Sequence, residues 1–192
     1  MAGTVAPDES HAALPRGRRA PYSLFFAIFP PPGEAAQIAQ YAAGVARDHR
    51  LQGRALSAHS LHVTLHDLGG YDVLPDDLVA AANAAGDAAN GPGFEVVFDR
   101  AASFSSEAFV LYGSNGVEQL AAFRHGLGMA MRDAGMRPTS SFTPHMTLLY
   151  DRQRIAEHPI DPVLWSAREF ALVKSHVGMG VHEILGRWPL RD

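Results

Sequence analysis

The chain has 192 residues, of which 47% are hydrophobic and 19% charged, and its formal net charge is −4. This composition can bury one substantial core, so we expect one compact domain. The negative balance argues against broad binding to nucleic acid, which requires a basic face. The absence of cysteine excludes disulfides and cysteine-based metal sites, and it is compatible with a cytoplasmic protein.

The N-terminal stretch, residues 1–20, is rich in Ala, Pro, Gly and charge without a periodic pattern. Such a composition predicts a flexible extension. The apolar run at 22–29 that follows is too short to cross a membrane and ends at three prolines. We therefore expect a first core strand there.

Apolar periodicity divides the rest of the chain into helices and strands. A polar stretch bounded by prolines, at 153–162, predicts a loop. The helices are expected at 33–50, 75–90 and 117–134, and the strands near 61–68, 94–104, 109–113, 141–151, 165–177 and 181–190.

The order of these elements does not alternate regularly enough to build a parallel doubly wound sheet. The chain also contains no glycine-rich phosphate loop of either common type. We therefore predict an α+β fold with mainly antiparallel sheets.

Two of the predicted strands carry the same motif. The segment SLHVTL at 60–65 is echoed by TPHMTL at 143–148, so the pattern recurs after 83 residues. Of the ten histidines, only His62 and His145 have Ser or Thr two residues later. On a strand, residues i and i+2 point to one face about 6.7 Å apart. Each copy therefore offers an imidazole and a hydroxyl side by side.

The doubled motif indicates a catalytic site more strongly than one copy would, because the histidine of a single His-x-Thr on a strand more often has only a structural role. Two imidazoles that approach one point can act as general base and general acid, since histidine titrates near pH 6.5. The hydroxyls of Thr64 and Thr147 can donate hydrogen bonds to non-bridging oxygens. A phosphodiester is the group that fits between such side chains.

The two motifs resemble the paired signature motifs of the 2H phosphoesterase superfamily, and most closely its branch of 2'-5' RNA ligases and RNA 2',3'-cyclic phosphodiesterases. The likeness covers about residues 22–190 and includes LFFAI at 24–28 followed by prolines. It implies that residues 21–192 form one domain of two lobes. These would be two pseudo-symmetric, mainly antiparallel sheets with flanking helices around a central cleft, and no metal or cofactor is implied.

The resemblance also implies an activity, the hydrolysis of a ribose 2',3'-cyclic phosphate, with 2'-5' ligation as its reverse. It makes His145 the base and His62 the acid, and it places Thr64 and Thr147 on the phosphate oxygens. The expected partner is an RNA 2',3'-cyclic phosphate end or a small cyclic nucleotide. The expected protein is a monomer in the cytoplasm, with no protein partner and no membrane association.

Some positions depart from the pattern of RNA-acting relatives. Tyr150 stands where many of them have Arg, and His66 stands where Lys is frequent. Both changes remove positive charge or make it depend on pH, which favours a short or nucleotide-sized substrate. Phe142 is placed to stack on a base or to fill the core. Arg54 and Lys174 are further candidates for phosphate contacts.

A histidine-based metal site is an alternative for His59, His62 and His66. On a strand the last two share a face and His59 does not, and no carboxylate or further histidine stands at ligand spacing. A metal site is therefore not expected. We predict instead that His66 lines the wall of the cleft.

Two other functions stay open. One is a nucleotide or RNA-end binding module without turnover, against which the intact His and Thr pairs argue. The other is a hydrolase of another small cyclic phosphodiester, such as ADP-ribose cyclic phosphate.

Overall fold

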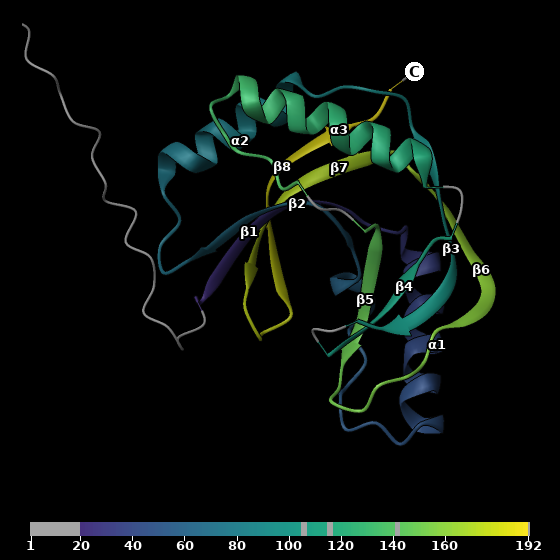
Figure 1. Cartoon of the computed structure of the whole chain (residues 1–192). Helices are drawn as coiled ribbons and strands as arrows, with labels where there is room; N and C mark the ends of the chain where they lie inside the picture. The colour runs from purple at the N-terminus through teal and green to yellow at the C-terminus, as the bar shows by residue number, and fades with distance from the viewer. Residues whose placement is uncertain (1–19, 105–106, 115–116, 141–142, 192) are drawn as a thin grey trace, which may run out of the picture.

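The computed structural model describes residues 20–104, 107–114, 117–140 and 143–191. The predicted extension therefore lies almost wholly outside the described residues. The elements follow one another along the chain as shown in Figure 1. They are β1 (Tyr22–Ile28), α1 (Pro32–Asp48), the 3₁₀ turn η1 (Ala58–Ser60), β2 (Val63–Tyr71), α2 (Asp76–Ala88), β3 (Phe94–Ser103), β4 (Ala108–Tyr112), α3 (Glu118–Asp133), β5 (His145–Tyr150), β6 (His158–Ala167), β7 (Glu169–His176) and β8 (Val181–Pro189).

The strands form one antiparallel sheet in the order β6-β3-β4-β5-β2-β1-β7-β8. Its two halves, β6-β3-β4-β5 and β2-β1-β7-β8, meet where β5 pairs with β2 through the single register pair Val63↔Met146. The predicted α+β class with antiparallel pairing is confirmed. The two predicted sheets are joined into one at this narrow seam.

The helices lie in two groups against the sheet (Figure 1). Helix α1 packs against β5 and β6, whereas α2 and α3 pack together, α2 against β7 and β8 and α3 against β2 and β3. The helices present apolar faces at the expected spacing; in α3 this face is Leu120, Phe123, Leu127 and Met131. Within the described part of the chain, no helix is both long enough and apolar enough to cross a bilayer.

Both copies of the repeated motif contain a β-bulge directly after their threonine. Along β2, the residues paired with β1 pass from Thr64 to His66, so Leu65 is the extra residue. Along β5, the residues paired with β4 pass from Thr147 to Leu149. A bulge shifts the alternation of side chains by one position. The residue after each bulge therefore faces the opposite side from the one that simple alternation predicts.

Strand β6 begins at His158 and occupies the second half of the stretch 153–162, where a loop was predicted. Its sequence includes Pro159 and Pro162. The strand lies at the edge of the sheet and pairs only with β3, so its outer backbone groups need no partner strand. Proline is tolerated at such an edge because no ladder hydrogen bond is lost there. The two prolines therefore end no strand. The loop prediction was wrong for residues 158–162 and right for residues 153–157.

Candidate active site

The two motifs meet at the seam of the sheet. Val63 and Met146 pair across it, and both are buried with an exposed fraction of 0%. Because the strands are antiparallel, the residue before one partner lies opposite the residue after the other. The histidine of each copy therefore faces the threonine of the other copy.

This register places four side chains together on the face of the sheet opposite to the buried pair: His62, Thr64, His145 and Thr147. All four are half-buried, whereas their neighbours along the strands are buried. Directly opposed residues in an antiparallel pair have Cβ atoms about 5 Å apart. The seam thus gathers two imidazoles and two hydroxyls within reach of one small group.

The two imidazoles are oriented by the same local hydrogen bond. The Nδ1 atom of His62 lies 2.8 Å from the carbonyl oxygen of Ser60, and that of His145 lies 2.7 Å from the carbonyl oxygen of Thr143. A carbonyl can only accept, so each Nδ1 carries the proton and donates it. Each neutral ring therefore keeps its lone pair on Nε2, where it can take a proton from a ligand.

Aromatic rings surround the first imidazole. The ring of His62 stacks on Phe25 with centroids 4.9 Å apart, and the rings of Phe29 and His182 lie at 5.9 and 5.1 Å. The pKa of His62 is lowered to about 4, mainly by this burial; the neighbouring histidines add to the lowering, and the backbone hydrogen bond opposes it. His62 is therefore neutral at neutral pH.

The second imidazole lies in a more polar place, at the wall of a cavity of about 400 Å³ that we call the cleft. The ring of Phe104 lies 5.2 Å from that of His145. The other lining residues supply three hydroxyls and one carboxylate. The full lining is Thr64, Leu65, Asp67, Phe104, Thr139, Thr143 and His145. The cleft therefore reaches the seam at Thr64 and His145.

His66 does not line this cleft, contrary to the prediction, because it is buried with an exposed fraction of 1%. The bulge at Leu65 turns it into the interior. There its Nε2 donates to the carbonyl oxygen of Arg124 at 3.0 Å, and its Nδ1 lies 3.1 Å from the hydroxyl of Thr139. The next residue, Asp67, takes the place on the cleft wall.

The remaining predicted contacts lie apart from the cleft. Tyr150, at the end of β5, is 58% exposed. Arg54 is exposed in the loop before the first motif and does not line the cleft. Lys174 forms an ion pair with Glu183 at 3.1 Å. Phe142 lies outside the described residues.

The three histidines weighed as a metal cluster do not converge. His59 is exposed, and its Nε2 lies 3.1 Å from the hydroxyl of Ser57. His66 points into the core, away from the face that carries His62. Across the ranges that the structure describes, no group of three or more His, Asp or Glu side chains is arranged to hold a metal ion.

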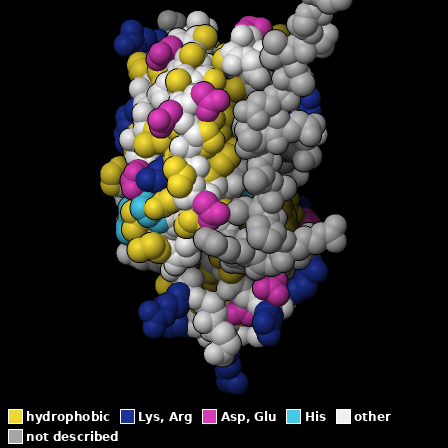
Figure 2. Space-filling view, turned by 90° about the vertical axis from the view of Figure 1, so that its left-hand side faces the viewer, with side chains coloured by type: hydrophobic (Ala, Val, Ile, Leu, Met, Phe, Trp, Pro, Cys, Tyr) yellow, Lys and Arg dark blue, Asp and Glu magenta, His cyan; other side chains and the backbone are white. Residues whose placement is uncertain are grey.

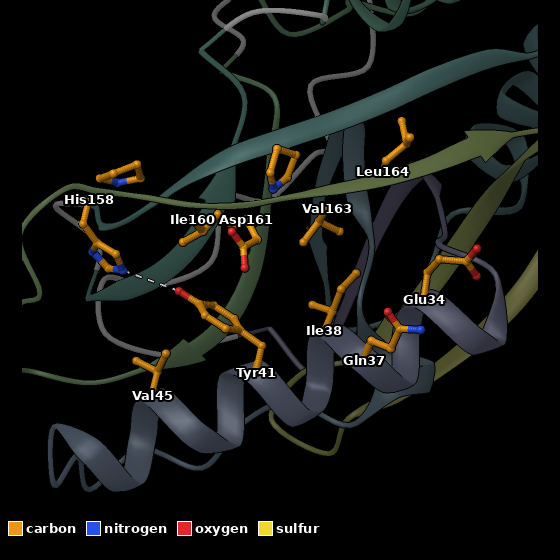
Figure 3. A pocket seen from close by; sticks show the side chains of 12 residues that line it. Glu34, Gln37, Ile38, Tyr41, Val45, His158, Ile160, Asp161, Val163 and Leu164 are labelled. Atoms are coloured by element: carbon orange, nitrogen blue, oxygen red, sulfur yellow. Dashed lines mark hydrogen bonds between the residues drawn. The ribbon is translucent and has the colours of Figure 1, made fainter.

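A larger cavity, of about 620 Å³, lies between α1 and β6 and shares no lining residue with the cleft (Figure 3). Its walls are mainly apolar, and at one end the hydroxyl of Tyr41 lies 3.4 Å from Nε2 of His158. Glu34 and Asp161 also line it, and no Lys or Arg does. Carboxylates without a cation repel phosphate. This cavity is therefore not the place for a phosphodiester, although it is the larger one.

Comparison with known proteins places these features in a family. The chain matches the model of the 2'-5' RNA ligase superfamily over residues 29–178. A search of curated proteins found no match. The structure resembles the apo form of Escherichia coli LigT, with 28% identity and a TM-score of 0.71, and the match covers 90% of this chain and 99% of LigT.

Two further solved structures have the same fold. One, described as a phosphoesterase, has 27% identity and a TM-score of 0.72 over 90% of this chain and 99% of that protein. The other, TT0787 of Thermus thermophilus, has 23% identity and a TM-score of 0.67, with coverage of 88% and 98%. LigT has also been crystallised with phosphate, 3'-AMP, ATP and NADP+.

Proposed function

The chain belongs to the 2'-5' RNA ligase superfamily, and from this premise we propose that residues 21–192 form a metal-independent phosphodiesterase for ribose 2',3'-cyclic phosphates. The same groups, working in reverse, would join a 5'-hydroxyl to a cyclic phosphate in a 2'-5' linkage. One observation carries the proposal. The pair Val63↔Met146 sets each histidine against the threonine of the other copy, on one face of the sheet.

The substrate phosphate sits over the seam in this proposal. A cyclic phosphodiester has two non-bridging oxygens that share one negative charge, and the hydroxyls of Thr64 and Thr147 donate one hydrogen bond to each. Hydrogen bonds to a charged acceptor are about twice as strong as neutral ones. The two Nε2 atoms then lie on either side of the phosphorus, where one reaches the attacking oxygen and the other the departing one.

His62 is the base in this mechanism, and His145 is the acid. The low pKa of His62 keeps its Nε2 free to take a proton from the water that attacks phosphorus. As the new P–O bond forms, the bond from phosphorus to one ribose oxygen breaks, and protonated His145 gives its proton to that oxygen. The product is a ribose phosphate monoester with one free hydroxyl. This assignment reverses the one that the family resemblance implied.

The relatives support a nucleotide as the ligand of the cleft. LigT was crystallised with 3'-AMP and with ATP, and the cleft here offers hydroxyls, an aromatic ring and a carboxylate that could contact a nucleoside. Its volume, about 400 Å³, lies within the range of about 300 to 1,000 Å³ of small-molecule sites. We therefore propose that the nucleoside attached to the cyclic phosphate occupies the cleft.

A panel of three substrates tests the function. Purified protein is given 2',3'-cyclic AMP, an oligonucleotide ending in 2',3'-cyclic phosphate, and ADP-ribose cyclic phosphate, each with and without chelator. We expect hydrolysis of the first two that chelator does not reduce. Binding of all three without turnover would identify a binding module instead, and turnover of the third alone would identify a hydrolase of that class.

A further inference from the structure

Five exposed arginines gather at one end of the molecule, although the whole chain is acidic. Three of them, Arg47, Arg50 and Arg54, follow one another through the end of α1 and the loop after it. The other two, Arg152 and Arg154, lie in the loop between β5 and β6. We call these five side chains the basic end.

Hydrogen bonds hold the two loops of the basic end together. The amides of Gln52 and Gly53 both donate to Oδ2 of Asp151, at 2.6 and 2.7 Å. The side-chain amide of Gln153 donates to the carbonyl oxygen of His49 at 3.2 Å. Figure 2 shows dark blue Lys and Arg side chains gathered at the lower end of the molecule, where these loops lie in Figure 1.

The basic end keeps a positive balance, because its five arginines outnumber Asp48 and Asp151, the two carboxylates beside them in the chain. Among the described residues, the ion pairs of the protein involve other side chains. The carboxylate of Asp151 accepts backbone amides, and these lower its pKa. The hydrogen bonds therefore hold the two loops together. Arg154 donates to the carbonyl oxygen of Ser103 at 3.2 Å, so the anion would be contacted mainly by the other four arginines.

A helix end explains only part of this cluster. Arg47 and Arg50 lie where the C-terminus of α1 attracts cations. The other three arginines lie outside the helix, and two of them come from a segment about a hundred residues later. The attraction of cations to a helix C-terminus is therefore not a sufficient account of the charge at the basic end.

Strand β5 connects the cleft to the basic end. It begins at His145 and ends at Tyr150, and the loop that carries Arg152 and Arg154 follows. At 3.4 Å per residue, this loop begins about 20 Å from His145. The bulge after Thr147 places Tyr150 on the face that carries His145. An exposed aromatic ring therefore stands between the cleft and the arginines.

The loop that carries Arg54 lies directly against this tyrosine. A Cβ atom on Gly53 would come within 1.9 Å of the carbonyl oxygen of Tyr150, so the two backbones touch. The equivalent of Tyr150 in the first copy of the motif is Asp67, which lines the cleft. An anionic strand is therefore repelled from the Asp67 side and attracted toward the Tyr150 side.

We propose that Tyr150 and the basic end bind single-stranded RNA that leads away from a terminal cyclic phosphate held in the cleft. The tyrosine stacks on a base and the arginines contact phosphates, which is the combination that single-strand binding sites use. This inference rests on the proposed function and narrows it, because it makes an RNA end the better substrate and a free cyclic nucleotide the poorer one. The acidic net charge is compatible with it because the positive charge is concentrated at one end.

The test compares a ten-nucleotide RNA ending in 2',3'-cyclic phosphate with 2',3'-cyclic AMP. The measured quantity is the ratio of kcat/KM for the two substrates, in wild type and in R50Q/R54Q/R152Q. The matched control is R132Q/R168Q/R191Q, which removes the same charge from exposed arginines elsewhere. Y150A and Y150F separate the ring from its hydroxyl. Binding of a fluorescent RNA decamer is measured at about 50 and about 200 mM NaCl in parallel.

We expect the ratio to favour the decamer in wild type and in the control, and to fall at least tenfold in R50Q/R54Q/R152Q. Y150A lowers it several-fold and Y150F leaves it unchanged. If three arginines contact phosphates, binding of the decamer weakens about 20-fold between the two salt concentrations. The inference would be overturned if the kcat/KM ratio fell equally in the two triple variants. It would also be overturned if decamer binding by R50Q/R54Q/R152Q weakened with salt as much as binding by wild type. Absence of turnover in wild type would instead count against the proposed function, and the binding arm would still decide the inference.

Discussion

The two half-sites at the seam have the same backbone but different surroundings. In both, the histidine Nδ1 donates to the carbonyl two residues earlier, and a bulge follows the threonine. His62 stacks on Phe25, which belongs to a buried apolar cluster with Ala27, Ala171 and Val173. His145 instead borders the hydroxyl-lined cleft. A repeated strand can thus present two identical groups, while the residues packed around one of them lower its pKa.

The largest expected effect comes from removing either histidine. H62A and H145A should each lower kcat for a cyclic nucleotide by roughly a hundredfold or more, because general acid and base catalysis each contribute that much. Near-normal turnover by either variant would contradict the two-histidine mechanism.

A substrate with an activated leaving group separates the two roles. Bis(p-nitrophenyl) phosphate releases a phenolate that needs no proton from an acid. H145A should therefore retain most of its activity on this ester relative to wild type, whereas H62A should not. The opposite result would restore the assignment that the family resemblance implied.

The threonines should give the next largest effect, and one that is equal in the two half-sites. T64V and T147V each remove one hydrogen bond to the charged phosphate while keeping the shape of the side chain. Such a bond contributes about 1.5 to 3 kcal/mol, so kcat/KM should fall roughly 10- to 100-fold in each. Steady-state kinetics of both variants checks this, and a strong inequality would show that the phosphate sits to one side of the seam.

The pH dependence tests the difference in surroundings directly. Because the pKa of His62 is lowered to about 4, the acid limb of kcat/KM should lie near pH 4, since this parameter reports the free enzyme. F25A removes the stacked ring and admits water, so the limb should move upward, toward the ordinary histidine value of about 6.5. An unchanged limb in F25A would show that the ring does not set the acidity.

Stability should respond to the same histidine. In the unfolded chain His62 takes up a proton below about pH 6.5, whereas in the folded protein it does so only near pH 4. Between these values the unfolded state binds more protons, so the free energy of unfolding falls as pH is lowered through that window. Denaturant titration of wild type and H62Q at about pH 7 and about pH 5 checks this. The pH-dependent loss should be smaller in H62Q.

The repeat, the strand character of both motifs and the antiparallel class could be predicted, because they depend on local alternation and on residue types. The bulges could not, since a bulge is defined by the partner strand. His66 was therefore expected in the cleft, and Asp67 was missed. The sequence offers no sign that Phe25, Phe29 and His182 would surround one imidazole, because they come from β1, the segment after it and β8.

The basic end shows the same limit over a longer range. In the sequence, Arg47 and Arg50 fit the end of a predicted helix, and Arg154 lies in a predicted polar loop. The two segments are brought together by contacts that the sequence does not show, among them the hydrogen bonds from Gln52 and Gly53 to Asp151 and from Gln153 to His49. The net charge is a sum over the whole chain, so it does not show where positive side chains are concentrated on the surface.

The smallest expected effect comes from removing the charge of Asp67, which follows the first bulge at the position that Tyr150 has after the second. Asp67 lies about one strand repeat, roughly 7 Å, beyond Thr64. Two unit charges at that distance in water repel by about 0.6 kcal/mol, which is about threefold in affinity. D67N keeps the oxygen that accepts the Gly69 amide and removes the charge, so KM for an RNA end should fall about threefold at low salt.

This gain should vanish at high salt, because screening already removes the repulsion there. D76N, at the exposed start of α2, changes the net charge equally at a distance from the cleft and should leave KM unchanged. A loss of affinity in D67N would show that the carboxylate accepts a hydrogen bond from the substrate. In that case the first half-site would attract the nucleoside through Asp67, and the path of the strand would be set by contact rather than by repulsion.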